Sequence, residues 1–191
     1  KDLDKIRNTP INDIKKLNSS DLRDNLGLVS QDVFLFSDTI FNNITLFNDN
    51  ISESQVWDSI DQVGARRFIE ALPNKLNFNV KERGASLSVG QRQLISCIRI
   101  MLYDPKIILL DEATSSVDSE TESMIQSAIS KILKNRTSIV VAHRLSTIKE
   151  VDNIIVLENG EIKEIGDHNS LNKSGGYYRR LYEMQNKNIL T

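Results

Sequence analysis

Four consecutive apolar residues at 107–110 run directly into the acidic pair Asp111 and Glu112. An unbroken apolar run of this length predicts a strand of a parallel sheet that is covered on both faces. Helical periodicity precedes the run over residues 91–104 and follows it over residues 119–133. Strands that alternate with helices in this way predict an α/β layer structure.

Other segments extend the same pattern. Residues 26–30 predict a strand, residues 33–36 a packed loop, and "TSIVVAH" (137–143) a second buried strand. "DNIIVLENGEIKEIG" predicts a hairpin that turns at Asn159-Gly160.

Capping signals and periodicity predict the helices. A capping box of Ser52 and Gln55 begins one helix, and a second helical piece stops before Pro73. A further capping box, Ser119 with Glu122, is predicted to begin the helix over 119–133. A last helix carries Tyr178, Leu181 and Met184.

The composition excludes some classes of protein. The chain of 191 residues is 39% apolar and 26% charged, which is ordinary for a globular protein. Its formal charge of −2, without a basic block, gives no indication of a nucleic-acid partner. Its apolar runs are too short to cross a bilayer.

The acids that end the 107–110 strand are candidates for nucleotide chemistry, because α/β sheets place ligands at the carboxyl ends of their strands. Asp111 is positioned to hold Mg²⁺ and Glu112 to polarise an attacking water. The alternative is a strand that simply ends in two solvated acids. His143, at the end of the next strand, can contact a γ-phosphate through its imidazole, or can be an isolated histidine.

The stretch "GASLSVGQRQL" (84–94) resembles a phosphate-binding loop but lacks its lysine, because Gln91 follows Gly90. Ser88 and Gln91 have capping-box spacing, so Ser88 is predicted to cap the next helix. A helix N-terminus offers free N–H groups and a partial positive charge, and Gly90 lets a phosphate approach closely. The alternative is an ordinary capped helix.

Taken in order, these segments resemble the nucleotide-binding domain of an ATP-binding cassette (ABC) transporter of the exporter type. "VSQDVFLFSDTI" resembles the Q-loop with Gln31, "LSVGQ" the signature motif and "IILLDE" the Walker B strand. "SSVD" resembles the D-loop ending at Asp118, "AHRLSTI" the switch region at His143, and "VKERG" the exporter X-loop.

The resemblance implies a P-loop NTPase-like core with a mostly parallel sheet and a helical subdomain. It divides the chain into a partial core with the Q-loop (1–49), the helical subdomain (50–85) and the remaining core (86–191). Walker A and its strand are expected to lie upstream, so the N-terminal part of the core is expected to be missing.

The resemblance also implies a mechanism in which ATP and Mg²⁺ are held between two nucleotide-binding domains. Glu112 and His143 would be catalytic, and Asp111 and Gln31 would hold Mg²⁺, with Gln31 also contacting the nucleotide. The signature residues Ser88, Val89, Gly90 and Gln91, together with Asp118, would contact the nucleotide of the facing domain. The implied partners are that second domain and a transmembrane domain, at the cytoplasmic face of a membrane.

Two departures from the family pattern affect the expected activity. Val89 replaces the first glycine of L-S-G-G-Q, but it falls at the first helical position and is expected to be tolerated. No G-x-x-x-x-G-K-[ST] occurs, so these 191 residues alone are expected to bind Mg-ATP poorly. The alternatives are a catalytically silent dimerising module and a chromosome-maintenance ATPase, although no sustained heptads support the latter.

Overall fold

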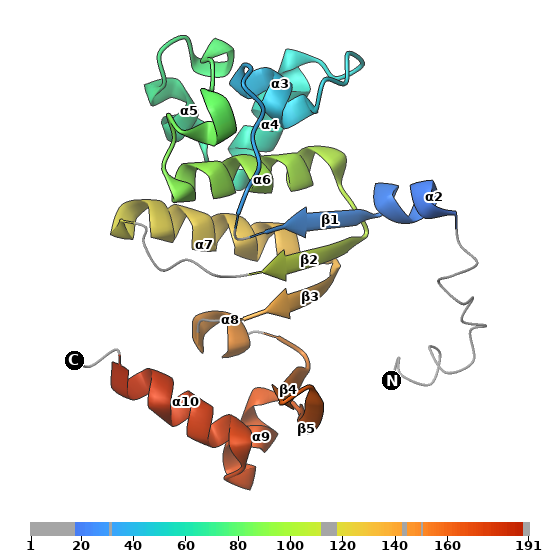
Figure 1. Cartoon of the computed structure of the whole chain (residues 1–191), viewed down its shortest axis with the longest axis vertical. Coiled ribbons are helices and arrows are strands. Elements are labelled where there is room, and N and C mark those ends of the chain that lie inside the picture. The colour runs from blue at the N-terminus through green and yellow to red at the C-terminus, as the bar shows by residue number, and fades with distance from the viewer. Residues whose placement is uncertain (1–17, 31, 112–117, 143–144, 150, 189–191) are drawn as a thin grey trace. The chain divides into compact units, whose positions relative to one another are not determined.

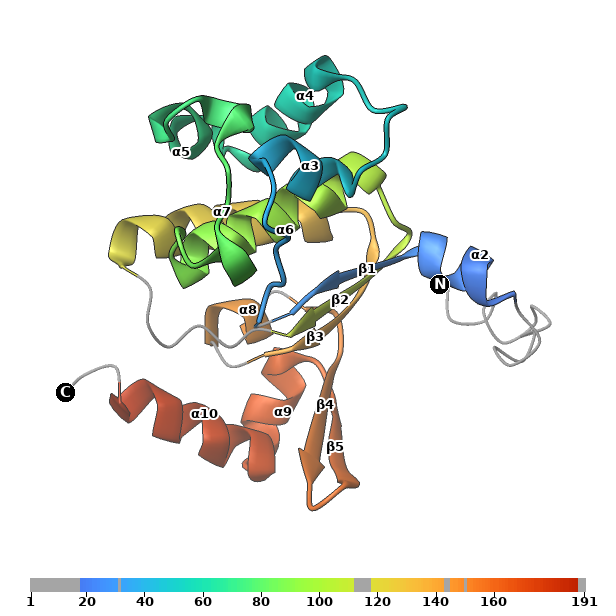
Figure 2. The same ribbon diagram turned by 45° about the horizontal axis from the view of Figure 1, so that its top comes forward.

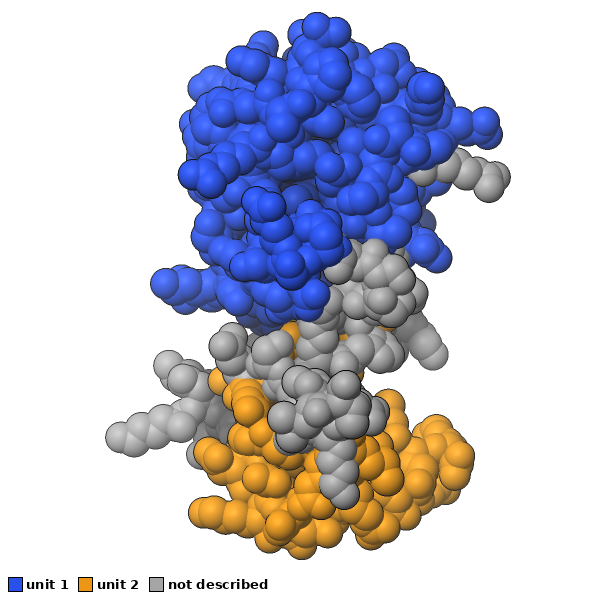
Figure 3. Space-filling view, turned by 90° about the vertical axis from the view of Figure 1, so that its left-hand side faces the viewer, with its two compact units in different colours: residues 1–110, 114–139 blue, residues 111–113, 140–191 orange. Residues whose placement is uncertain are grey.

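A computed structural model of the chain describes residues 18–30, 32–111, 118–142, 145–149 and 151–188. Two compact units divide the chain (Figure 3). Unit 1 comprises residues 1–110 and 114–139, and unit 2 comprises residues 111–113 and 140–191.

A three-stranded sheet organises the first unit (Figure 1). Its strands are β1 (Leu26–Val29), β2 (Ile107–Asp111) and β3 (Thr137–Val141), in the spatial order β1-β2-β3. β1 and β2 are parallel, with Leu26 opposite Ile107 and Val29 opposite Leu110. The predicted α/β class with a parallel sheet is therefore confirmed.

The two long helices, α6 (Val89–Tyr103) and α7 (Ser119–Leu133), lie on the same side of the sheet (Figure 2). Contact between α6 and β1 is close, because a Cβ added at Gly27 would lie 2.4 Å from Ile100 Cδ1. Val29 shares that face of β1 and is buried, whereas Leu28, on the opposite face, is 60% exposed. The helices therefore bury one face of the sheet.

The prediction that the 107–110 strand and β3 are both fully buried is wrong. In β2, Ile108 and Leu110 are buried and the intervening Leu109 is half-buried. In β3, which has one neighbouring strand in the described sheet, Ile139 is 62% exposed and Val141 is 55% exposed. Apolar runs indicate that a strand can be buried on two faces, but neighbouring elements decide how many faces are covered.

The helical part of unit 1 lies beyond α6, on the side away from the sheet (Figure 2). It contains α3 (Ile40–Thr45), α4 (Glu53–Val63), α5 (Arg66–Ala71) and the 3₁₀ turns η2 (Lys75–Asn77) and η3 (Glu82–Gly84). The predicted capping box of Ser52 and Gln55 begins α4, and Gly64 ends it with a φ of 85°. A short helix, α2 (Ser19–Asp24), precedes β1.

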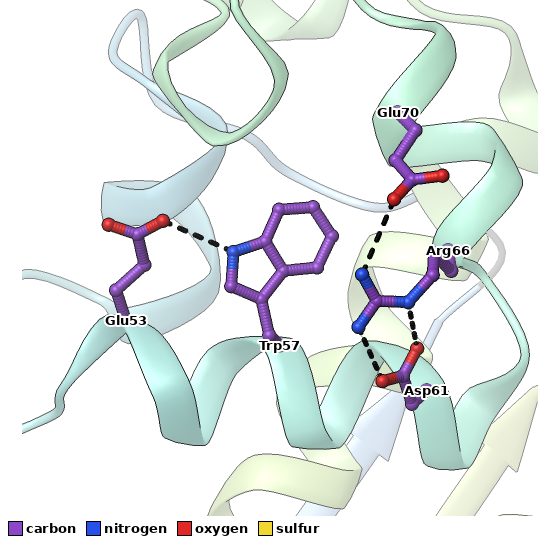
Figure 4. Close-up of polar contacts among 5 residues, drawn as sticks. All are labelled: Glu53, Trp57, Asp61, Arg66 and Glu70. Atoms are coloured by element: carbon purple, nitrogen blue, oxygen red, sulfur yellow. Dashed lines mark hydrogen bonds and ion pairs between the residues drawn. The ribbon is translucent and has the colours of Figure 1, made fainter.

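A polar cluster joins α4 to α5 on the surface (Figure 4). Arg66 forms a forked ion pair with Asp61 and a longer one with Glu70. The Arg66 guanidinium also stacks 4.8 Å from the centre of the Trp57 ring. These contacts fix the corner between the two helices, although exposed ion pairs contribute little stability.

Unit 2 packs a hairpin against three helices. β4 (Ile154–Glu158) and β5 (Glu161–Gly166) are antiparallel, and their turn has positive φ at Asn159 and Gly160, as the sequence predicts. α8 (Leu145–Lys149), α9 (His168–Ser174) and α10 (Tyr177–Asn188) complete the unit. Its buried cluster consists of Val156, Leu171 and Tyr178.

None of the helices in the described part of the chain combines the length and apolarity needed to cross a membrane. The division of the chain at residues 49 and 85 stays a prediction.

Candidate functional site

The N-terminus of α6 is held by a capping box. The N–H of Gln91 donates to Ser88 Oγ (3.2 Å), and the N–H of Ser88 donates to Gln91 Oε1 (2.9 Å). Both the predicted cap and the predicted helical position of Val89 are confirmed. The resemblance assigns Gln91 to nucleotide binding, and its side-chain oxygen is engaged in the cap.

The first turn of α6 presents donors without a compensating charge. No hydrogen bond joins the backbone N–H of Val89 or Gly90 to another described residue, as expected of the first positions of a helix. The turn contains no acidic side chain, and Ser88 and Val89 are exposed. A partial positive charge and two free N–H donors therefore lie at a helix tip that is exposed at Ser88 and Val89 and buried at Gly90, which is the chemistry of a phosphate site.

Gly84 has a structural role beside this helix. Its φ is 78°, and a Cβ there would lie 2.6 Å from Arg92 Cδ. Arg92 in turn donates to the carbonyl oxygen of Leu87 (2.8 Å). The glycine therefore allows the Arg92 stem to pack closely and support the loop that leads into α6.

Asp111, which the sequence predicts as a magnesium ligand at the end of a strand, ends β2 and is exposed. A carboxylate oxygen at the carboxyl end of a parallel strand suits Mg²⁺, which prefers hard oxygen ligands. Within the described ranges, no three His, Cys, Asp or Glu side chains gather as a metal-binding group. Asp111 thus fits the donor type that Mg²⁺ needs, as one ligand.

Asp118 caps α7, and the predicted capping box of Ser119 and Glu122 is wrong by one residue. The N–H of Thr121 donates to Asp118 Oδ1 (2.9 Å), and Ser119 is the first residue of the helix. This backbone hydrogen bond holds the pKa of Asp118 below its ordinary value. One oxygen of this predicted nucleotide contact is therefore already engaged within the chain.

Gln31, Glu112 and His143 lie outside the described residues. Their assignments therefore stay predictions from the sequence. Among the described candidates, the structure brings Ser88, Val89, Gly90 and Gln91 together at one helix tip.

The structure also reveals an exposed aromatic patch that the sequence analysis missed. We call Phe34, Phe36 and Phe47 the aromatic patch. The Phe34 and Phe36 rings meet edge to face at 5.1 Å, and those of Phe36 and Phe47 at 5.3 Å. Their side chains are 60%, 41% and 49% exposed, respectively.

The segment before α3 is accordingly only half packed, and the predicted packed loop over 33–36 is wrong for half of its residues. Val33 and Leu35 are buried, whereas Phe34 and Phe36 point outward. The signal that could have revealed this was the period of two, which places successive side chains of an extended segment on opposite sides.

Burial excludes Cys97 as a nucleophile. Cys97 is fully buried in α6, which raises the pKa of its thiol to about 12. The thiol is therefore protonated near neutral pH and is not a nucleophile.

Comparison with known proteins identifies relatives over most of the chain. The sequence profile of the family described as ABC transporter matches residues 3–115. The chain is 44% identical over 172 residues to the probable multidrug resistance ABC transporter ATP-binding/permease protein YheH of Bacillus subtilis (strain 168). It is 47% identical over 174 residues to ABC transporter B family member 13 of Arabidopsis thaliana.

The chain spans only part of each relative. The match covers 90% of this chain and 26% of the Bacillus protein, and 91% of this chain and 14% of the Arabidopsis protein. A solved structure of a bacterial Atm1-family ABC exporter with ATP bound is similar, with a TM-score of 0.81 and 38% identity. That match covers 91% of this chain and 30% of the exporter chain.

Proposed function

This chain belongs to the ABC transporter family, and we propose that it is the ATP-binding and ATP-hydrolysing part of an exporter. The observation that carries the proposal is the tip of α6, where the N–H groups of Val89 and Gly90 have no described hydrogen-bond partner, the first turn has no acid and Val89 is exposed. The name of the solved neighbour, a bacterial Atm1-family ABC exporter, supports export as the direction of transport.

Residues at or just after the carboxyl ends of β1, β2 and β3 supply the proposed hydrolytic chemistry. Glu112 acts as general base toward the attacking water, and His143 stabilises the charge that develops on the γ-phosphate. Asp111 and Gln31 hold the magnesium ion, which when bound neutralises charge on the phosphates. The exposed carboxylate of Asp111 supports its part of this assignment.

The α6 tip acts on a nucleotide held by a second nucleotide-binding domain. Ser88 keeps the first turn of α6 in place, and the N–H groups of Val89 and Gly90 receive the terminal phosphate. Gln91 locks Ser88 through the capping box, and Asp118 contacts the nucleotide through its remaining oxygen. The tip needs no lysine of its own, because the facing domain supplies the phosphate-binding loop.

The proposed transmembrane partner contacts unit 1 through the aromatic patch and the X-loop segment at 80–84. The exposure of Phe34, Phe36 and Phe47 supports this, because contiguous exposed apolar side chains mark interaction sites. Contact with a transmembrane partner would hold this domain at the cytoplasmic face of the membrane.

The decisive experiment replaces Glu112 by Gln in the complete transporter. We expect ATP binding within twofold of the wild-type protein, because no binding contact is lost. Hydrolysis should fall at least 100-fold, and the closed dimer should accumulate, because the general base is removed. ATP titration, phosphate release and crosslinking of the two domains measure these three quantities.

The matched control is Glu120→Gln, which removes an exposed carboxylate from the first turn of α7 instead. Wild-type hydrolysis in Glu112→Gln would remove Glu112 from its role. Absence of hydrolysis in the unmodified transporter would favour a catalytically silent dimerising module. We expect the 191 residues alone to bind Mg-ATP more weakly than micromolar in a calorimetric titration.

A further inference from the structure

Asn43, in α3, is fully buried and bonds to the chain segment that carries the aromatic patch. Its Oδ1 accepts the N–H of Phe36 (2.8 Å), and its Nδ2 donates to the carbonyl oxygens of Phe36 (3.0 Å) and Thr39 (2.9 Å). The amide side chain therefore pairs with both polar groups of Phe36, as a neighbouring strand would. The side chain of Phe36 is exposed, whereas its backbone is held by hydrogen bonds.

Arg99, in α6, completes the connection from the opposite side. Its Nε donates to the Asn43 carbonyl oxygen (2.6 Å), and its Nη1 donates to the Phe34 carbonyl oxygen (3.3 Å). No carboxylate forms an ion pair with Arg99 within the described ranges, and burial lowers its pKa to about 10. The guanidinium remains charged at neutral pH and is compensated by carbonyl oxygens.

This arrangement differs from ordinary packing between two helices. Arg99 is half-buried, and withdrawing a cation even partly from water without a carboxylate costs free energy. An apolar pair of similar volume would pack α3 on α6 at least as well. An apolar pair could not form hydrogen bonds with the backbone of residues 34–36, because the carbonyl oxygens there need a donor. The polar pair of Asn43 and Arg99 therefore fixes the backbone of residues 34–36 at a defined position on α6.

α6 connects this point to the phosphate-facing tip. Ser88 and Arg99 are eleven residues apart along the helix axis, which corresponds to roughly 16 Å. Residues 91–103 contain neither glycine nor proline, so no residue of the usual kinking types interrupts the rod. A displacement applied at Arg99 is therefore passed to the first turn of α6.

We infer that Asn43 and Arg99 are positioning residues that tie the segment at 34–36 to α6, so that movement of the segment following Gln31 moves the tip at Ser88. The inference rests on the proposed function, since the tip matters only if it meets a nucleotide. Neither residue touches the phosphates. Both act through the position of α6.

Tyr103 provides a matched control on the same helix. Its hydroxyl donates to the Thr45 carbonyl oxygen at the end of α3 (2.5 Å). Tyr103→Phe removes a bond between α6 and α3 without touching residues 34–36. Arg99→Met and Arg99→Lys remove the bonds that reach residue 34, and the lysine variant keeps the charge.

The experiment measures a distance and an activity in the complete transporter. Spin labels at Ser37→Cys and Ala85→Cys, both exposed positions, report the spread of distances between the end of the segment and the loop before α6. The native Cys97 is buried and remains unlabelled. In Arg99→Met we expect a distance distribution at least twice as broad, and kcat for ATP about tenfold lower with KM within twofold.

Arg99→Lys should give a smaller change in the same direction, and Tyr103→Phe should change neither quantity. The inference is overturned if Arg99→Met leaves the distribution as narrow as in the wild-type protein. Equal broadening in Tyr103→Phe would overturn it as well, because the effect would then be general loosening. Broadening without any change in kcat would also overturn it.

The distance measurement separates this inference from the proposed function. If the unmodified transporter hydrolyses no ATP, the proposed function fails, while the distances still test the connection itself. If the variants do not fold, a measurement on the unmodified protein still tests the inference. The Phe36 amide should exchange with solvent deuterium as slowly as amides in the middle of α6, and exchange at the rate of an open loop would contradict the connection.

Discussion

The N-termini of α4 and α6 are built alike but leave different surfaces. Each begins with a Ser-x-x-Gln capping box, Ser52 with Gln55 in α4 and Ser88 with Gln91 in α6. Both boxes close with hydrogen bonds in each direction. Capping chemistry alone therefore does not distinguish a structural helix from one that can receive an anion.

The first-turn charge makes the difference. α4 carries Glu53, whose carboxylate compensates the positive end of the helix and also accepts the Trp57 indole N–H (3.1 Å). α6 has no acid in its first turn and exposes Val89 there instead. An anion site is therefore indicated by the absence of an acid from the first turn of a capped helix, as much as by the cap.

The largest effect should follow from giving α6 the charge that α4 carries. Val89→Glu places a carboxylate in the first turn, which complements the helix dipole and repels a phosphate. We expect kcat for ATP hydrolysis in the complete transporter to fall about 100-fold, or about 2.7 kcal/mol in activation free energy. Steady-state phosphate release measures the loss.

The matched control is Val89→Gln, because glutamine has nearly the same shape as glutamate but no charge. Its kcat for ATP hydrolysis should fall less than threefold. The converse variant, Glu53→Gln, should leave hydrolysis unchanged. Comparable activity in Val89→Glu and Val89→Gln would show that charge at the α6 tip is irrelevant.

An intermediate effect should come from removing the two caps. Ser88→Ala and Ser52→Ala should each destabilise their helix by about 1 kcal/mol, because the same hydrogen bond is lost. Native-state hydrogen exchange of the first-turn amides measures both losses. Only Ser88→Ala should lower hydrolysis, by about tenfold, and an equal loss in Ser52→Ala would indicate a general effect on stability.

The smallest effect concerns the N-cap of α7, where the capping group is the carboxylate of Asp118 and not a serine hydroxyl. The Thr121 N–H lowers the pKa of Asp118 below the ordinary value of 3.8. The stabilisation is therefore complete above pH 4 to 5 and is lost as the pH falls through the lowered pKa. Serine does not titrate in this range, so α4 and α6 should keep their caps.

Hydrogen exchange of the first turn of α7 between pH 6 and pH 3, corrected for intrinsic rates, tests this difference. Asp118→Asn should remove the pH dependence while keeping an accepting oxygen. Loss of protection that begins above pH 5 would contradict the lowered pKa.

Local patterns were sufficient for most elements of the fold. The periodicities and capping signals predicted α4, α6, β2 and the hairpin turn at Asn159-Gly160, because the cap, the turn and the apolar stripe are encoded within a few residues. The α7 cap was misplaced by one residue, since Asp118 and Ser119 are both good N-cap residues. The tip of α6 was predicted for the same local reason.

The tertiary structure decided the features that depend on distant partners. It decided the exposure of β3, the outward faces of Phe34 and Phe36, and the contact of Arg99 with Asn43, which lies 56 residues away. A sequence specifies what each residue can donate, accept or bury within a turn or two. Which donor meets which carbonyl, and which apolar face remains uncovered, depends on packing between elements far apart in the chain.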